Sequence, residues 1–313
     1  MSKVYVYHHN DHDGIVAAGI LRIHLIDVEK RNKEDIIFYS IGYHVELNFD
    51  HIDFTNRDKV YFLDYSFSNE HNRNEFEKLL KRRVVARDVR WIDHHKTSIG
   101  MLEEYDIPGI RDTSLCGAAW TYLFCKGNLN EWLEYDNISK LFHEAYYIPP
   151  FLKHIDDYDC WKKIYPDTNY LHYGLRIAHP GSPLIRVLLR NDKRAKEKIR
   201  NIISKGEIIV KNNEFEDKAY HIGCYGFEFT LPEEHGGLHC FCINRKGNSI
   251  MFGDKINEYD AVMPFYFIKG KWNYSLFSNK ENVDCSEVAK SYGGGGHKGA
   301  AGWVSKEFIF SEV

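Results

Sequence analysis

The sequence predicts an α/β protein in which helices cover both faces of a parallel sheet, followed by a smaller α/β domain. Over the first 95 residues, short apolar runs alternate with amphipathic stretches. The apolar runs are almost continuously hydrophobic, which is typical of strands buried on both faces of a parallel sheet. Three of these runs lead directly into turns rich in aspartate or histidine, namely HHNDHDG, DYSFS and DHHKTS.

The elements of this first region follow from hydrophobic spacing. Apolar residues recur at helical intervals in two segments, and short apolar runs predict strands between them. The expected helices span residues 14–26 and 69–82, and the expected strands span residues 4–7, 36–41, 59–63 and 89–92. Residues 114–154 are expected to be mainly helical, with Ser114 as an N-cap and Pro149-Pro150 forcing a break.

The segment 186–220 differs in kind from its surroundings, because it holds ten basic and six acidic residues and few aromatic ones. We expect an exposed helical connector there. The predicted domains are therefore a metal-binding catalytic domain over 1–185, the connector over 186–220, and a substrate-binding domain over 221–313. The basic stretch 186–205 is interpreted as a solvated helix face, with a nucleic-acid contact as the alternative.

The last hundred residues contain β-like runs at 239–243, 261–268 and 272–278, and then a glycine-rich turn. Seven scattered cysteines, with no CxxC pair, indicate free thiols in a reducing compartment. Cys240 and Cys242 lie beside His239, but no second ligand pair follows, so zinc is not expected there.

Composition excludes two classes of protein. The chain has 41 lysines and arginines against 45 aspartates and glutamates, a net charge of −4, which argues against a protein that coats long nucleic acid. No run approaches the roughly 20 apolar residues that span a bilayer, and the N-terminus lacks the apolar stretch of a signal peptide. We therefore expect a cytoplasmic protein that does not enter membranes.

The acidic turns suggest a metal site. Asp11 and Asp13 follow one expected strand, Asp64 follows another, and Asp93-His94-His95 follows a third. Each alone is also typical of a polar turn or a helix cap. Together they point to one site, because ligands bind at the carboxyl ends of strands in open α/β sheets. Carboxylates mixed with imidazole suit Mn²⁺ or Mg²⁺.

These motifs resemble those of a known family. The segments Asp11-His-Asp-Gly14, Asp64, Asp93-His-His95 and His154-Ile-Asp-Asp-Tyr-Asp-Cys-Trp161 resemble the four motifs of the DHH phosphoesterase superfamily. The segment Tyr292-Gly-Gly-Gly-Gly-His-Lys-Gly-Ala-Ala-Gly302 resembles the signature of the accompanying DHHA1 domain. Among the members, the sequence is most similar to the nanoRNase and cyclic-nucleotide phosphodiesterase branch. The resemblance implies an active site in the cleft between the two domains.

The resemblance also implies roles for individual residues. Two Mn²⁺ ions, or Mg²⁺ in their place, would be held by Asp11, Asp13, Asp64, His94 and an aspartate of the fourth motif. We choose Asp157 for that position, with Asp156 and Asp159 as alternatives. His9 is taken as an additional ligand, with His8 as the alternative. Asp93 would orient a histidine, and His95 would face the substrate as a general acid, unless it is a core histidine.

The glycine run 293–296 admits two interpretations from its residues: a flexible loop, or a turn whose successive N–H groups form an anion-binding nest. The small residues that follow at 299–302 could begin a helix. By the resemblance, Gly294, Gly295, Gly296, His297 and Lys298 would hold a terminal phosphate or base of the substrate. Phe277 stands where many DHHA1 domains carry arginine, so one phosphate-binding guanidinium is missing.

The expected function is a Mn²⁺-dependent phosphodiesterase that cleaves short single-stranded oligonucleotides to mononucleotides with a metal-activated water. The expected partner is such a small nucleotide substrate rather than long duplex nucleic acid. Alternatives are a phosphomonoesterase or polyphosphatase, a cyclic-nucleotide phosphodiesterase, and a nucleotide-binding regulatory module without turnover. The sequence leaves the oligomeric state open, and a homodimer is allowed.

Overall fold

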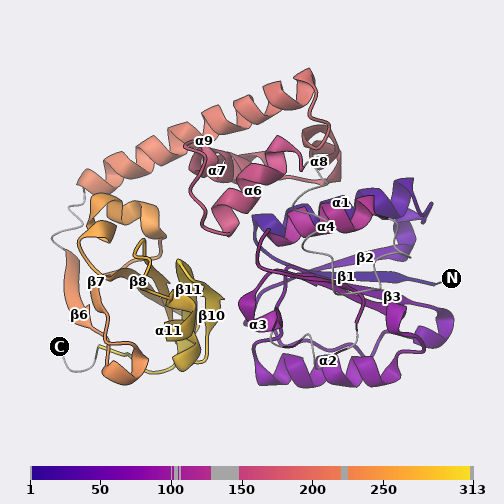
Figure 1. The fold of residues 1–313 in the computed structure, drawn as a ribbon, viewed down its shortest axis with the longest axis horizontal. Coiled ribbons are helices and arrows are strands. Elements are labelled where there is room, and N and C mark those ends of the chain that lie inside the picture. Colours follow the sequence, from indigo (N-terminus) through magenta and orange to yellow (C-terminus); the bar gives the residue numbers. More distant parts are fainter. Residues whose placement is uncertain are drawn as a thin grey trace. The chain divides into compact units, whose positions relative to one another are not determined.

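The computed structural model describes residues 2–99, 101, 105, 107–127, 148–219 and 225–310. The chain divides into two compact units, residues 1–208 and 209–313 (Figure 1). Each unit has its own hydrophobic core. The division lies within the long helix α9 (Lys193–Ala219). The roles expected for the two domains stay predictions. Among the residues that the structure describes, none of the helices combines the length and apolar character needed to cross a bilayer.

The first unit is built on a five-stranded sheet in which every pair of neighbouring strands is parallel. Its strand order is β2-β1-β3-β4-β5. The strands are β1 (Val4–His9), β2 (Ile36–Ile41), β3 (Lys59–Leu63), β4 (Val89–Asp93) and β5 (Gly109–Arg111). The expected α/β class and parallel sheet are confirmed, and β2 and β3 have the predicted bounds.

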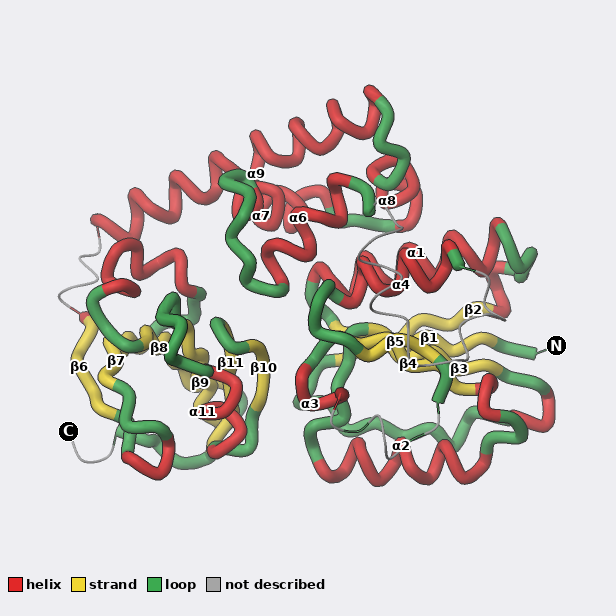
Figure 2. Tube along the Cα trace, in the orientation of Figure 1, coloured by secondary structure: helices red, strands yellow, loops and turns green. Residues whose placement is uncertain are grey.

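Helices cover both faces of this sheet, as Figures 1 and 2 show. The face with α1 (His12–Asp27) and α4 (Gly117–Lys126) has a largely aliphatic core, which also receives residues of α6 (Pro150–Asp159), α7 (Thr168–Ala178) and α8 (Ser182–Leu188). The opposite face, covered by α2 (Glu70–Arg82), is aromatic. There Phe67 stacks on Phe76 at 4.0 Å, and both rings contact Trp91 edge-on. The high aromatic content of the sequence is thus concentrated partly on one side of the sheet.

Short elements complete this unit. They are α3 (Lys96–Ile99) and the 3₁₀ turns Lys33–Asp35, Phe54–Asn56 and Ala86–Asp88. Ser114 is not the predicted N-cap, because α4 begins at Gly117 with Cys116 before it, and Ser114 instead bonds Asp112. Pro150 occupies the first turn of α6, where a missing backbone N–H is tolerated. Most of the segment between these two helices lies outside the described residues.

The second unit contains a six-stranded mixed sheet of order β10-β11-β9-β8-β7-β6. Only β7 and β8 are parallel among its paired strands. The strands are β6 (Gly226–Thr230), β7 (His239–Asn244), β8 (Ala261–Ile268), β9 (Lys271–Phe277), β10 (Gly295–His297) and β11 (Ala300–Ser305). Helix α11 (Cys285–Ser291) and the 3₁₀ segments Glu233–His235 and Ser249–Asn257 accompany them. The three predicted β runs are therefore strands.

Residues 299–302 do not begin a helix, because Ala300–Ser305 is strand β11. The glycine run before them ends α11 and starts a hairpin. Gly293 has a φ of 77°, and its N–H bonds Lys290 O while the N–H of Gly294 bonds Ala289 O. This pair of hydrogen bonds forms a Schellman motif at the C-terminal end of α11. Glycine is common at the first residue after such a helix because it adopts positive φ without strain. The chain then enters β10, which pairs antiparallel with β11. Two N–H groups expected in an anion-binding nest thus cap a helix instead.

Candidate metal centre

The carboxyl ends of β1, β3 and β4 place three polar segments at one edge of the parallel sheet, as the sequence predicted. His9 ends β1, Asp64 follows β3, and His94 follows β4. Asp11 and Asp13 join them from the start of α1. The structure therefore brings together five of the six predicted ligands, within contacts of 2.8–3.8 Å between neighbouring side chains.

Asp64 lies at the centre of this group. Its φ is 54°, a left-handed conformation that is uncommon for a residue other than glycine and that concentrates at functional sites. The residue is 1% exposed, and neither carboxylate oxygen accepts a hydrogen bond from the described part of the chain. Burial and the neighbouring Asp13 and Asp11 raise the pKa of Asp64 well above its usual range. Burying an ionised carboxylate without hydrogen bonds is costly, and a bound cation would offset this cost.

Asp13 is held by the beginning of α4. Its two oxygens accept hydrogen bonds from Gly117 N at 2.7 Å and Ala118 N at 2.8 Å. Burial and the nearby Asp159 and Asp11 nevertheless raise the pKa of Asp13 to about 7. A Cβ at Gly117 would lie 2.8 Å from Asp64 Cβ and 3.0 Å from Asp13 Oδ2, so only glycine fits there. Gly117 was not singled out from the sequence.

Asp11 and His9 form the outer part of the centre. Asp11 caps α1 by accepting from Gly14 N at 2.9 Å, and its other oxygen lies 2.8 Å from His9 Nδ1. His9 Nδ1 is also 3.8 Å from Asp64 Oδ2. His8 points elsewhere and its Nδ1 bonds its neighbour's carbonyl oxygen at 2.8 Å. The geometry thus favours His9 over His8.

His94 faces three carboxylates at once. Its Nε2 lies 3.0 Å from Asp159 Oδ2, 3.1 Å from Asp64 Oδ1 and 3.5 Å from Asp13 Oδ2. Burial acts to lower the pKa of His94, but the adjacent carboxylates of Asp159 and Asp64 raise it well above the usual value. A cation at this position would replace the imidazole proton and satisfy the same oxygens.

Our choice of Asp157 in the fourth motif needs correction. Asp157 accepts hydrogen bonds from Ile164 N at 2.6 Å and Tyr165 N at 3.2 Å, so it stabilises the loop after α6. Asp156 likewise accepts from Cys116 N and from Lys162 Nζ. Asp159 is the member of this motif that reaches His94. The geometry therefore favours Asp159, one of the two alternatives.

Asp93 orients His95, as expected for its role. Asp93 is fully buried, and its Oδ1 lies 2.7 Å from His95 Nδ1 and accepts a bond from His94 N. Burial acts to raise the pKa of Asp93, but His95 and His94 lower it below the ordinary value. His95 Nε2 is 3.1 Å from the hydroxyl of Tyr43. Tyr43 is a neighbour that the sequence did not reveal.

The donor set fits divalent cations. The groups His9–Asp11–Asp64 and Asp13–Asp64–His94 each have ligand atoms within 4.8 Å of one another, and they share Asp64. Oxygen-rich sets with imidazole are typical of Mn²⁺ and Mg²⁺ sites. One shared carboxylate between two such groups is what a pair of ions would require.

No family model matches the sequence. Two curated proteins do: an uncharacterised protein of Acanthamoeba polyphaga mimivirus, 23% identical over 320 residues, and the oligoribonuclease NrnB of Bacillus subtilis (strain 168), 24% identical over 322 residues. The matches cover 96% and 95% of this chain, and 66% and 72% of those proteins. Among solved structures, the DHH domain of a member of a ribosomal protein family matches 97% of this chain and 82% of its own, with a TM-score of 0.54 and 13% identity.

The resemblance to the DHH/DHHA1 phosphoesterases is confirmed. The segments that resemble the DHH motifs lie in the first unit, where the triplet Asp93-His94-His95 stands at the end of β4.

The DHHA1-like signature lies in the second unit. Gly295, Gly296 and His297 form β10, Lys298 continues into the turn, and Gly294 belongs to the cap of α11. Lys298 O accepts a hydrogen bond from Cys285 N at 2.8 Å. Phe277, which stands in place of that arginine, ends β9 and packs partly buried against a small apolar cluster. Substrate binding by residues 294–298 stays a prediction.

Proposed function

We propose that this DHH/DHHA1 protein is a divalent-metal-dependent phosphodiesterase that hydrolyses short single-stranded oligonucleotides to mononucleotides. The observation that carries the proposal is the buried Asp64 carboxylate, which is shared by two ligand groups and accepts no hydrogen bond within the described chain. The oligoribonuclease NrnB, which matches 95% of the chain, supports the choice of substrate.

Two Mn²⁺ ions, or Mg²⁺ in their place, would be held by six side chains. The six residues are His9, Asp11, Asp13, Asp64, His94 and Asp159. When bound, a metal pair lowers the pKa of a water that attacks phosphorus and neutralises the charge of the phosphodiester.

The protein's own contribution begins with orientation. The N-terminal amides of α4 fix both oxygens of Asp13, and the left-handed backbone of Asp64 turns its carboxylate to the same edge of the sheet. Gly117 leaves room for these two carboxylates to approach each other. Ligands fixed in this way need no reorganisation during the reaction.

His95 is the residue we assign to proton transfer. Asp93 Oδ1 accepts the proton on His95 Nδ1, so Nε2 is the atom that remains for exchange. Tyr43 Oη lies 3.1 Å from that nitrogen and keeps the ring in one orientation. We infer that Nε2 gives its proton to the oxygen of the departing nucleotide.

The test is hydrolysis of a 5′-labelled dinucleotide in the presence of Mn²⁺, Mg²⁺ or EDTA. We expect mononucleotide release with metal and none with EDTA. Asp64→Asn should abolish the release, whereas the same change at the exposed Asp50 should leave it intact. An uncleaved dinucleotide, with Mn²⁺ binding demonstrated by calorimetry, would exclude the proposal.

The same assay separates the remaining alternatives. Polyphosphate and 3′,5′-bisphosphonucleoside release inorganic phosphate, and cyclic dinucleotides release linear products. A protein that binds nucleotides and cleaves none of these substrates would be a binding module. If any of these substrates has a higher kcat/KM than the dinucleotide, that substrate, and not the short oligonucleotide, defines the substrate class of the enzyme.

A further inference from the structure

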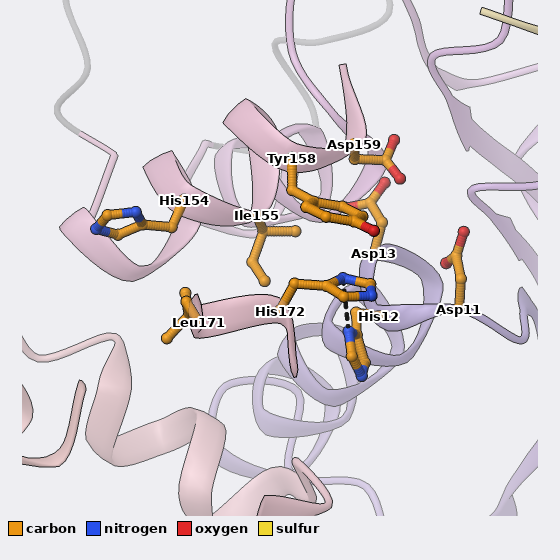
Figure 3. Close-up of a pocket in the computed structure, with 9 residues that line it drawn as sticks. All are labelled: Asp11, His12, Asp13, His154, Ile155, Tyr158, Asp159, Leu171 and His172. Carbon is orange, nitrogen blue, oxygen red and sulfur yellow. Dashed lines mark hydrogen bonds between the residues drawn. The ribbon is translucent and has the colours of Figure 1, made fainter. Parts of the chain in front are cut away.

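Beside the metal centre, α6 and α7 enclose a pocket together with the start of α1 (Figure 3). Asp11, Asp13 and Asp159 form its wall on the metal side. The rest of the wall comes from Ile155, Tyr158 and His154 of α6, Leu171 and His172 of α7, and His12. We call this cavity the α6–α7 pocket. A group attached to a phosphate at the metal centre would therefore lie next to it.

Rings dominate one side of the α6–α7 pocket. Tyr158 and His172 are stacked with their centroids 3.7 Å apart and an angle of 12° between planes. His12 lies edge-on to His172, and the Nδ1 atoms of the two imidazoles are 3.1 Å apart. One of these nitrogens must donate and the other accept, which fixes both rings. The result is a rigid aromatic wall, and all three rings are half-buried.

The chemistry of the wall selects against a second phosphate. None of the described residues that line the pocket is a lysine or arginine, and three are carboxylates. His172 does not supply a positive charge either, because burial and the adjacent His12 lower its pKa to about 3. Uncharged imidazole and phenol rings beside Ile155 and Leu171 suit a flat, neutral, hydrogen-bonding group.

The size of the pocket restricts that group. Its volume is about 60 Å³, which is room for about four ordered waters and therefore for one small planar ring. A chain of several nucleotides does not fit such a volume, which restricts the proposed occupant to a single base.

We propose that the α6–α7 pocket binds one nucleobase of the substrate, through the ring wall of Tyr158, His172 and His12. This inference rests on the proposed function, since it assumes that the phosphodiester next to that base is bound at the metal centre. It assigns to the first unit a contact with the nucleoside, in addition to the contacts with phosphate.

The test is a thermodynamic cycle of the double-mutant type, in which a substitution in the protein is combined with removal of one base from the substrate. The substrates are a diadenosine dinucleotide and its two analogues that each lack one base. In the wild type with Mn²⁺, loss of one of the two bases should lower kcat/KM about tenfold, as expected for one stacking contact. In His172→Leu, the same loss should have an effect below about twofold.

Two further variants serve as controls. His172→Phe retains a ring that can stack on Tyr158, so it should preserve most of the base effect. His71→Leu makes the same substitution as His172→Leu on the exposed surface of α2, and it should behave as the wild type. Circular dichroism spectra of all variants establish that they are folded.

The outcomes distinguish the two proposals. An equal base effect in the wild type and in His172→Leu overturns the pocket proposal while the phosphodiesterase stands. If the wild type cleaves neither the dinucleotide nor the analogues, the proposed function fails. In that case the base-binding proposal is tested by equilibrium dialysis with AMP. Weaker AMP binding by His172→Leu than by His71→Leu supports the proposal, and equal binding rejects it.

Discussion

The carboxyl end of β3 and the last turns of α6 both bury an aspartate, with opposite consequences. Asp157 in α6 is 1% exposed and accepts two backbone hydrogen bonds. Asp64 after β3 is equally buried and accepts none within the described chain. A buried carboxylate with donors stabilises the local fold, whereas one without donors is costly unless a cation binds. Surroundings, and not residue type or burial, separate the structural aspartate from the candidate ligand.

The contrast between Asp64 and Asp157 is tested most strongly by Asp64→Asn. Removal of a group that merely orients a metal ligand costs about 10–100-fold in activity, so loss of the ligand itself should cost at least about 100-fold. The metal-free variant should also be more stable than the wild type, because a carboxylate crowded by Asp11 and Asp13 is gone. Dinucleotide kinetics and urea unfolding in EDTA measure the two effects. A less stable metal-free variant would contradict this account of Asp64.

Metal addition tests the same contrast through the stability that a bound ion adds to the folded protein. At a Mn²⁺ concentration 100 times the dissociation constant, the wild type should gain about 2.7 kcal/mol of stability. Asp157→Ala should gain the same amount, and Asp64→Asn should gain much less. Thermal unfolding with and without Mn²⁺ provides the measurement. Equal gains for all three proteins would show that Asp64 is not a ligand.

Asp157→Ala is expected to act on stability alone. The N–H groups of Ile164 and Tyr165 lose their acceptor, at a cost of about 1–3 kcal/mol in the free energy of unfolding. Urea unfolding gives this value, and calorimetry with Mn²⁺ on the folded variant should show an unchanged affinity. Loss of Mn²⁺ affinity would instead restore Asp157 as the ligand of the fourth motif.

The smallest effect is expected for Lys162→Met. Lys162 Nζ bonds Asp156 Oδ2 at 2.7 Å and Ser114 O at 2.7 Å, but its side chain is 28% exposed. Because solvent screens such a pair, the loss should be only about 1 kcal/mol, with Cys116 N still bonded to Asp156. Urea unfolding measures it. A change in activity per folded molecule would place Asp156 nearer the chemistry than its contacts suggest.

Much of the fold could be predicted because local patterns encode it directly. The apolar runs at 36–41 and 59–63 are strands with those bounds. β3 shows the reason most clearly, since a strand buried on both faces leaves a nearly continuous hydrophobic run. The glycine run at 293–296 was harder to interpret. Glycine serves helix caps, hairpins and anion nests equally well, and only the pairing of β10 with β11 decides among them.

The metal centre shows the same limit at the level of single residues. Polar turns after parallel strands must meet at one edge, so Asp11, Asp64 and His94 could be grouped from the sequence. The choice among Asp156, Asp157 and Asp159 could not be made in this way. It depends on which carboxylate meets the backbone donors of residues 116, 164 and 165, and these donors come from other segments.

By itself, the sequence determined the parallel sheet, the edge that carries the candidate site, and most of the candidate ligands, because hydrophobic periodicity and strand ends are local properties. Only the tertiary structure decided that Asp159 reaches His94, that Gly117 must lack a side chain, and that His12, Tyr158 and His172 share one pocket. Those facts depend on α4, α6 and α7 packing against α1, and contacts between distant segments leave no periodic trace in a single sequence.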